Sequence, residues 1–349
     1  MTTGDAGRAP AEGTPVQAVT TRLEPATCDE IDLGASGSVA HVVVPAVGRD
    51  LWRGGELRLA FLTDGGRRGA GGRRGVGDRR AVGVHVRRRS PAMLEFRVGA
   101  APRRAGADIG PRARDAPPQA AAEVPQPEAE RAVAQTRRVL SLDWDGASFS
   151  ATAGRDPVLD GLRRANPGIR PILFGSPYEA ACWAVVCQGL RTEQAVALYS
   201  RLVTRYGRVV PVGGSSRVVL APPAELRAVS PTTRLSARKR ERLAVVAEAA
   251  EAGLLDAAAL RSMEPGEAVD LVDQLPGIGP LSAELVVARG AGHPDVFPAH
   301  DRVLAAAMRE LYDGRFVDVA ERWRPYRSWA SFVIRSAAVL HGVRPGVSR

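Results

Sequence analysis

Cysteine is rare in this chain of 349 residues, which holds only Cys28, Cys182 and Cys187. Three thiols at these spacings form neither a disulfide framework nor a zinc or iron–sulfur ligand set. Cys182 and Cys187 lie in the apolar run ACWAVVC, which favours buried, small hydrophobic roles for both. The cysteine content therefore predicts no bound metal.

Lysine and long apolar runs are also almost absent. Lys239 is the only lysine, so arginine supplies nearly all of the positive charge. No stretch approaches the ~20 apolar residues of a membrane span. The N-terminal MTTGDAGRAPAEGTP lacks the apolar centre of a signal peptide. We expect a cytoplasmic protein without a membrane partner.

Positive charge dominates, with a formal net charge of +10 and a pI of about 10.5. Such a balance favours a polyanionic partner, nucleic acid before membrane. A GC-rich genome would also enrich arginine, because arginine codons are GC-rich, and the scarcity of lysine fits that explanation. Charge alone therefore does not decide the function.

The N-terminal third alternates short β-type runs with low-complexity segments. Residues 1–16 predict a disordered tail, and residues 17–100 predict a small antiparallel β-domain. Within it, GGRRGAGGRRGVGDRR at 65–80 has almost no apolar side chains and predicts a flexible basic loop. An Ala/Pro/Arg-rich linker follows at 101–127. The strands are expected at 39–44, 57–61, 81–86 and 93–98.

Helical periodicity begins near Glu128 and continues to residue 345. Ser176-Pro177-Tyr178-Glu179 reads as a capping box with proline at the first helical position. The overall fold class is therefore α+β, with a C-terminal all-α bundle behind the β-domain. Helices are expected at 128–142, 156–164, 177–189, 192–206, 222–228, 237–252, 256–262, 265–274, 281–289, 301–311 and 323–340.

Residues 271–289 form two amphipathic segments joined by Pro276-Gly277-Ile278-Gly279. The two glycines permit a tight turn whose backbone comes close to another surface. The following helix begins with N–H groups that have no intrahelical partner and that attract an anion such as phosphate. This hairpin can therefore grip a nucleic-acid backbone without reading its sequence.

These residues resemble the helix-hairpin-helix DNA glycosylases, in particular the DNA-3-methyladenine glycosylase II branch. The matching pieces are Leu275-Pro276-Gly277-Ile278-Gly279, Ala283, Arg289, Asp295-Val296-Phe297 and Asp301. A later run, WRPYRSWA at 323–330, matches the closing helix of the family. The resemblance covers roughly residues 131–345 and implies a glycosylase bundle that houses the hairpin.

Asp301 is the main catalytic candidate. By itself, an aspartate at a helix start is most often an N-cap, and the two roles are compatible. The resemblance implies hydrolysis of an N-glycosidic bond, in which a carboxylate stabilises the oxocarbenium ion and orients the attacking water. The base must first rotate out of the duplex into a pocket.

Family members that also cut the strand carry a lysine just after the turn, where this chain has Leu281. The sole lysine, Lys239, lies in a basic run expected to face solvent or phosphate. Iron–sulfur relatives need four cysteines after the helical core, and none follows Cys187. The resemblance therefore implies a monofunctional enzyme without a cofactor, although a monovalent cation at the hairpin carbonyls is compatible with it.

The resemblance also places DNA contacts and a base pocket. Gln188 precedes the position that fills the gap left by the flipped base. Spacing places Gly189 there, but glycine has no side chain to fill the gap, whereas Leu190 has one. A helix end stopped by Gly189 is an equally good interpretation. His300 contacts DNA or serves as a cap, two interpretations of equal weight. The further assignments are Pro276, Gly277, Ile278 and Gly279 for DNA, Leu281, Leu285, Tyr178, Trp183 and Arg335 for the pocket, and Arg289, Arg302 and Arg327 for phosphates or structure.

Relatives line this pocket with aromatic side chains, which Leu281, Leu285 and Arg335 are not. Tyr178, Trp183 or Trp329 could substitute, although core packing is the commoner role of such residues. We expect a monomeric, nucleoid-associated base-excision enzyme that acts on alkylated purines in double-stranded DNA. The alternative is a DNA-structure-binding protein that kept the hairpin and lost catalysis. A transcription regulator lacks any recognition-helix signal beyond the hairpin.

Overall fold

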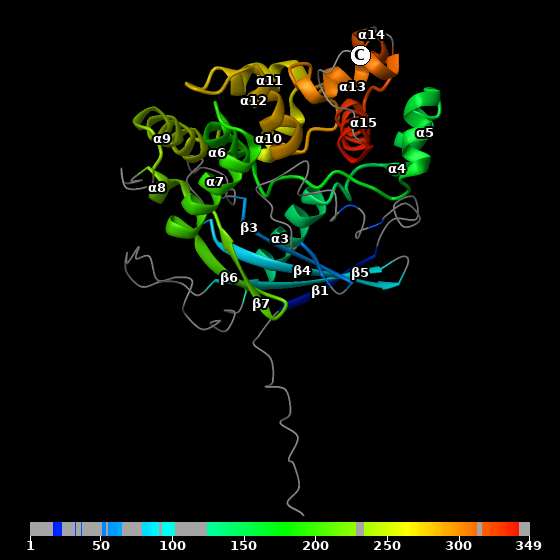
Figure 1. The fold of residues 1–349 in the computed structure, drawn as a ribbon. Helices are drawn as coiled ribbons and strands as arrows, with labels where there is room; N and C mark the ends of the chain where they lie inside the picture. Colours follow the sequence, from blue (N-terminus) through cyan, green and yellow to red (C-terminus); the bar gives the residue numbers. More distant parts are fainter. Residues whose placement is uncertain are drawn as a thin grey trace, which may run out of the picture.

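The computed structural model describes residues 17–22, 32, 36, 51–53, 55–64, 79–90, 93–101, 124–227, 234–312 and 316–341. A β-sheet forms one layer, and the helical part stacks on it (Figure 1). Cys28, the 1–16 tail, the strand expected at 39–44 and most of the 65–80 loop and the linker lie outside the described residues.

The sheet is antiparallel throughout, in the strand order β1-β5-β4-β3-β2. Strand predictions at 57–61, 81–86 and 93–98 are confirmed. Along β3, Leu57, Leu59 and Phe61 alternate toward the core, as a sheet with one covered face requires. The strands are β1 (Gln17–Arg22), β2 (Trp52–Arg53), β3 (Glu56–Leu62), β4 (Ala81–Ser90) and β5 (Met93–Ala100).

One helix, α3 (Gln126–Val139), covers the inner face of the sheet. Its small residues Ala129 and Ala132 share a buried core with Val84 and Phe96 of the strands. Gln135 ties the two parts together, because its Nε2 donates to the carbonyls of Leu62 and Gly175.

The remaining helices follow the predicted order. The boundaries are α5 (Pro157–Ala165), α6 (Pro177–Cys187), α7 (Thr192–Tyr206), α8 (Pro223–Leu226), α9 (Ala237–Glu251), α10 (Ala257–Ser262), α11 (Pro265–Asp273), α12 (Pro280–Leu285), the π-helical η3 (Val286–Ala291), α13 (Arg302–Tyr312), α14 (Phe316–Glu321) and α15 (Arg327–His341).

Three features of the helical part were not predicted, and α14 is one of them. Helix α4 (Gly146–Ala153) begins at the Asp145 N-cap, and its weak amphipathicity hid it. A β-hairpin, β6 (Arg208–Val212) and β7 (Ser215–Val219), turns at Gly213 and Gly214, which both adopt positive φ. It packs against β4 so closely that a side chain at Gly83 would overlap Val212. The C-terminal part is therefore predominantly, but not entirely, helical.

The helices divide between two cores. Residues of α6, α7, α9, α10, α11, α12 and η3 share one, and residues of α4, α5, α13 and α15 share the other. Helices α4 and α5, which come early in the helical part, thus pack against the C-terminal helices α13 and α15. Asp301, at the start of α13, lines a cavity with residues of α12, η3 and α15, so it lies where these two groups of helices meet.

Candidate active site

The hairpin turn connects α11 to α12 over residues 274–279. Ile278 is buried and donates its backbone N–H to the Leu275 carbonyl at 2.9 Å. Gly277 has φ +90°, and a Cβ there would meet Arg242 Cδ at 2.5 Å. Gly279 is the N-cap of α12, with open space where its side chain would be. The backbone conformation at position 277 therefore requires glycine, whereas Gly279 leaves the protein surface open to the approach of another molecule.

Side chains from two other helices hold this turn. Gln188, at the end of α6, donates from Nε2 to the Gly277 carbonyl at 2.6 Å. Its Oε1 accepts from the Arg242 guanidinium of α9. Neighbouring Gly189 is exposed with φ +69°, while Leu190 is half-buried against the core. Gln188 therefore supports the hairpin from within the protein.

Asp301 caps α13 and also lines a cavity. Its Oδ1 accepts the backbone N–H groups of Val303 at 2.8 Å and Leu304 at 3.1 Å, as an N-cap does. Its Oδ2 accepts from Arg335 Nε at 2.8 Å. The side chain remains 19% exposed. The carboxylate is thus held in one orientation with access to a cavity.

That cavity has a volume of about 80 Å³ and lies between α12–η3 and α15. Leu281, Leu285 and Arg335, three of the predicted pocket residues, line it together with Asp301. Typical ligand sites measure about 300–1,000 Å³, so a base entering this one must displace side chains. Leu281 is 51% exposed at its mouth. The other lining residues are Glu284, Ala288, Arg289, Pro298, Ser328, Ser331 and Phe332.

A larger cavity, of about 390 Å³, lies between β3, α7 and β7. It contains Glu179, whose burial raises its pKa to about 7. Asp301 does not line it. We therefore assign the chemistry to the smaller cavity, because the carboxylate and the hairpin meet there.

Arg289 has an internal role. Burial, together with nearby Arg335, lowers its pKa to about 9, and Asp301 opposes that shift. Its Nη2 donates to the Ile172 carbonyl at 2.7 Å, and its guanidinium lies 5.0 Å from the Phe332 ring centroid. Of the three candidate phosphate arginines, Arg289 and Arg327 are committed to internal contacts, and only Arg302 is exposed.

Sequence reasoning missed Glu284, which lines the cavity and is 5% exposed. Its Oε2 accepts the His300 backbone N–H at 3.1 Å, and its Oε1 lies 2.7 Å from His300 Nδ1. Glu284 is three residues after Leu281 and one before Leu285. Helical periodicity could therefore have placed it on the same face as the predicted pocket residues.

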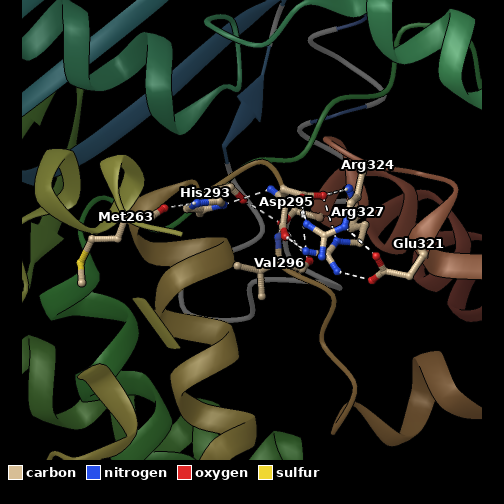
Figure 2. Close-up of polar contacts among 8 residues, drawn as sticks. Met263, His293, Asp295, Val296, Glu321, Arg324 and Arg327 are labelled. Atoms are coloured by element: carbon tan, nitrogen blue, oxygen red, sulfur yellow. Dashed lines mark hydrogen bonds and ion pairs between the residues drawn. The ribbon is translucent and has the colours of Figure 1, made fainter. Parts of the chain in front are cut away.

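The loop from η3 to Asp301 is clamped to the start of α15 (Figure 2). Arg327 donates to the Asp295 carboxylate from Nε at 2.9 Å and from Nη2 at 3.1 Å, and to its carbonyl at 2.8 Å. Arg324 reaches the same carboxylate at 2.8 Å, and Glu321 pairs with both arginines. This network holds the segment that presents Asp301.

His293 anchors the other end of that loop. Its Nδ1 accepts the Asp295 backbone N–H at 3.1 Å, so Nε2 carries the proton toward the Met263 carbonyl at 3.2 Å. Burial lowers the pKa of His293, which keeps the ring neutral. Ser328 completes the clamp by donating from Oγ to the His293 carbonyl at 2.7 Å.

The two predicted aromatic pocket residues are in the core instead. Tyr178 is fully buried and donates its hydroxyl to the Ala221 carbonyl at 2.9 Å. Trp183 packs edge-on against Tyr199. Trp329 stacks on Phe149 with ring centroids 4.1 Å apart. None of the three lines the cavity, so the expected pocket roles of Tyr178 and Trp183 are not met; Phe332 is its aromatic residue.

Lys239 lies in the first turn of α9, and its Nζ donates to the Val186 carbonyl at 2.6 Å. Desolvation lowers its pKa. This lysine does not line the cavity that holds Asp301. Over the described residues, no three His, Cys, Asp or Glu side chains gather as a metal site would require. None of the described helices has the length and apolarity to span a membrane.

Known proteins are similar to this chain in sequence and in fold. No family model matches the chain. A probable bifunctional transcriptional activator/DNA repair enzyme AlkA from Mycobacterium tuberculosis is 35% identical over 208 residues, which make up 57% of this chain and 41% of that protein. A DNA-3-methyladenine glycosylase from Bacillus subtilis is 25% identical over 206 residues, 56% of this chain and 68% of that protein.

The solved structure of a 3-methyladenine DNA-glycosylase from Archaeoglobus fulgidus has the same fold, with a TM-score of 0.69 at 19% identity. The match covers 93% of this chain and 99% of that one. The resemblance inferred from the hairpin, and the fold class of a small sheet followed by a helical bundle, are confirmed. The chain spans less than half of the mycobacterial relative.

Proposed function

We propose that this chain, a homologue of the 3-methyladenine DNA glycosylases with the helix-hairpin-helix glycosylase fold, hydrolyses the N-glycosidic bond of damaged purines in double-stranded DNA. Alkylated purines are the proposed substrates, in line with the names of its relatives. The observation that carries the proposal is the position of Asp301, held in a fixed orientation at a cavity beside the hairpin.

In the proposed reaction, the sugar gains positive charge as the base departs. The Asp301 carboxylate stabilises that charge from a position that needs no rearrangement, since Oδ1 and Oδ2 are already oriented by Leu304, Val303 and Arg335. Water attacks C1′ and is the only co-reactant. Leu281 and Leu285 would provide apolar contact for the flipped base.

The hairpin would grip the DNA backbone. Gly279 has open space before the first helical N–H groups of α12, so a phosphate can approach them. Pro276, Gly277 and Ile278 shape this turn, with Gln188 behind it. Leu190 remains our proposal for the gap filler, because Gly189 has no side chain. A monovalent cation at the turn is compatible with this arrangement.

We further propose that the enzyme leaves the abasic strand intact. Strand cleavage on this fold requires an amine at the sugar to form an imine. Leu281 stands where that amine would be, and Lys239 of α9 is held at the Val186 carbonyl of α6. The proposed enzyme is therefore monofunctional.

The second candidate, a DNA-structure-binding protein without catalysis, is favoured by two observations. The cavity is small, and Phe332 is the single aromatic side chain among its lining residues. An electron-poor alkylated base would thus find few stacking and cation–π partners. The retained carboxylate at the cavity favours the enzyme.

The deciding experiment is base release from methylated duplex DNA. The enzyme should liberate free alkylated purine, leave an abasic strand that only alkali cleaves, and form no borohydride-trapped protein–DNA adduct. Tight DNA binding without base release would support the binding protein instead. An adduct that disappears in Lys239→Ala would contradict the monofunctional assignment.

A further inference from the structure

Glu284 of α12 is a buried carboxylate that holds the residue before Asp301. It is 5% exposed at the wall of the Asp301 cavity, and its two oxygens contact one residue, His300. A buried carboxylate is costly unless it is paired. The pairing places an exposed imidazole, 57% accessible, immediately before Asp301 in the chain.

The geometry defines the tautomer of His300. A carboxylate oxygen 2.7 Å from Nδ1 can only accept, so Nδ1 carries a proton. In the neutral ring, the lone pair then belongs to Nε2, on the far side of the imidazole from Glu284. An imidazole oriented by a carboxylate in this way is the arrangement that general bases use elsewhere.

Asp301, in contrast, is already engaged at both oxygens. Oδ1 accepts two backbone N–H groups, and Oδ2 accepts from a guanidinium. These bonds suit a group that remains charged and stabilises positive charge. They leave less capacity for taking a proton from water, so a separate base would relieve Asp301 of that role.

We propose that His300, positioned by Glu284, accepts the proton of the attacking water. This assignment rests on the proposed glycosylase function and divides its chemistry between two neighbouring residues. The water oxygen forms a bond to C1′, and the C1′–N bond breaks with its electron pair going to the base. The water proton goes to His300 Nε2, and the imidazolium returns it to solvent. A cationic alkylated base leaves as the neutral base.

The charges around the dyad fit this cycle. Glu284 faces His300 from α12, Asp301 follows it, and Arg335 of α15 is paired with Asp301. Arg289 of η3 is turned to the Ile172 carbonyl. The imidazolium formed in the reaction would therefore sit beside a carboxylate that compensates its charge.

The test combines single-turnover base release at saturating enzyme with a tautomer measurement. His300→Gln should lower the rate about 100-fold with an unchanged Kd, and should abolish the rise of rate with pH on the acid side. Glu284→Gln should lower the rate about tenfold, and Glu284→Asp should recover part of it. Glu310→Gln, an exposed carboxylate on α13, is the matched control and should behave as wild type.

Nitrogen-15 histidine spectra of the free protein give a readout that does not need activity. They should show His300 protonated at Nδ1 and His293 at Nε2, with only the former altered in Glu284→Gln. An unchanged rate and pH profile in His300→Gln, or a loss confined to Kd, would overturn the assignment; the latter would make His300 a DNA contact. Absence of base release by the wild-type protein would remove the proposed function itself.

Discussion

The hairpin turn and the cavity beside it are specified in different ways. The turn depends on backbone geometry: Gly277 at φ +90°, Gly279 with nothing in front of it, and Ile278 as a buried anchor. The cavity depends on side chains that come from α12, η3, the loop before α13, and α15. Five consecutive residues determine a turn of this kind, whereas the residues that line the cavity are spread over about fifty positions of the sequence.

This difference explains why the two regions depart from the expected pattern to different extents. The turn keeps every residue of the pattern, since each has a backbone task. The cavity keeps Asp301 but surrounds it with Leu281, Leu285 and Arg335. Under the proposed function, substrate choice can thus change at the cavity while DNA binding at the turn stays the same.

The largest expected effect is on the support of the cavity. Arg327→Ala should lower the free energy of unfolding by about 3–5 kcal/mol, because it leaves the buried Asp295 carboxylate without its main partner. Arg324→Ala removes the half-exposed partner of the same carboxylate and should cost less than about 1 kcal/mol. Urea denaturation measures both. Equal losses would mean that the clamp does not depend on the buried pair.

The next largest effects distinguish the two glycines of the turn, because only one of them should affect stability. Gly277→Ala would strain a positive φ and collide with Arg242, so it should destabilise the protein by about 1–3 kcal/mol as well as weaken DNA binding. Gly279→Val has free space in the protein and should leave the unfolding midpoint unchanged, yet lower DNA affinity about tenfold, or ~1.4 kcal/mol.

Fluorescence anisotropy with an abasic duplex, over a series of salt concentrations, measures the binding half of that comparison. The affinity of wild type should fall steeply with salt and depend little on DNA sequence. If Gly279→Val binds DNA as wild type does, then the turn is a core element and not a contact surface.

The smallest expected effect is a pH dependence of the free energy of unfolding, which arises from His293 in the loop before Asp301. Burial lowers the pKa of His293, so the unfolded state binds its proton more readily than the folded state does. Stability from this group is therefore present above its ordinary pKa of 6.5 and declines as pH falls below it. The slope is at most about 1.4 kcal/mol per pH unit.

Thermal unfolding of wild type and His293→Gln from pH 8 to pH 5 would test this. The difference in unfolding temperature between the two proteins should narrow as the pH falls, because only the wild type has an imidazole at position 293 to protonate. A gap that widens toward acid would reverse the assigned sign.

The sequence allowed the turn, Asp301 and three strands to be predicted, since each has a local signature. Gly277, Ile278 and Gly279 are adjacent, and β3, β4 and β5 alternate or run apolar along their length. The β6–β7 hairpin had such a signature at Gly213-Gly214 and was still missed. Its strands are short and lie in the segment between two predicted helices, to which no element was assigned.

The cavity could be predicted only in part, because its walls depend on which helix faces meet. Tyr178 and Trp183 have the chemistry of pocket residues, but α6 turns them toward α7 and Ala221. Phe332 lines the cavity without having been predicted, and Glu284 was missed although its helical spacing from Leu281 could have indicated it. The Asp301–Arg335 pair spans 34 residues and follows from the packing of α13 on α15.

The most direct test of Asp301 compares Asp301→Asn with wild type on one duplex that carries a single methylated purine. Asparagine keeps the size and an oxygen for the N-cap bonds but removes the negative charge. We expect single-turnover base release to fall by about 2 kcal/mol or more, roughly 30-fold, while the Kd for the duplex stays within about twofold. Equal rates of base release in the two proteins would contradict the assignment of Asp301 as the catalytic carboxylate.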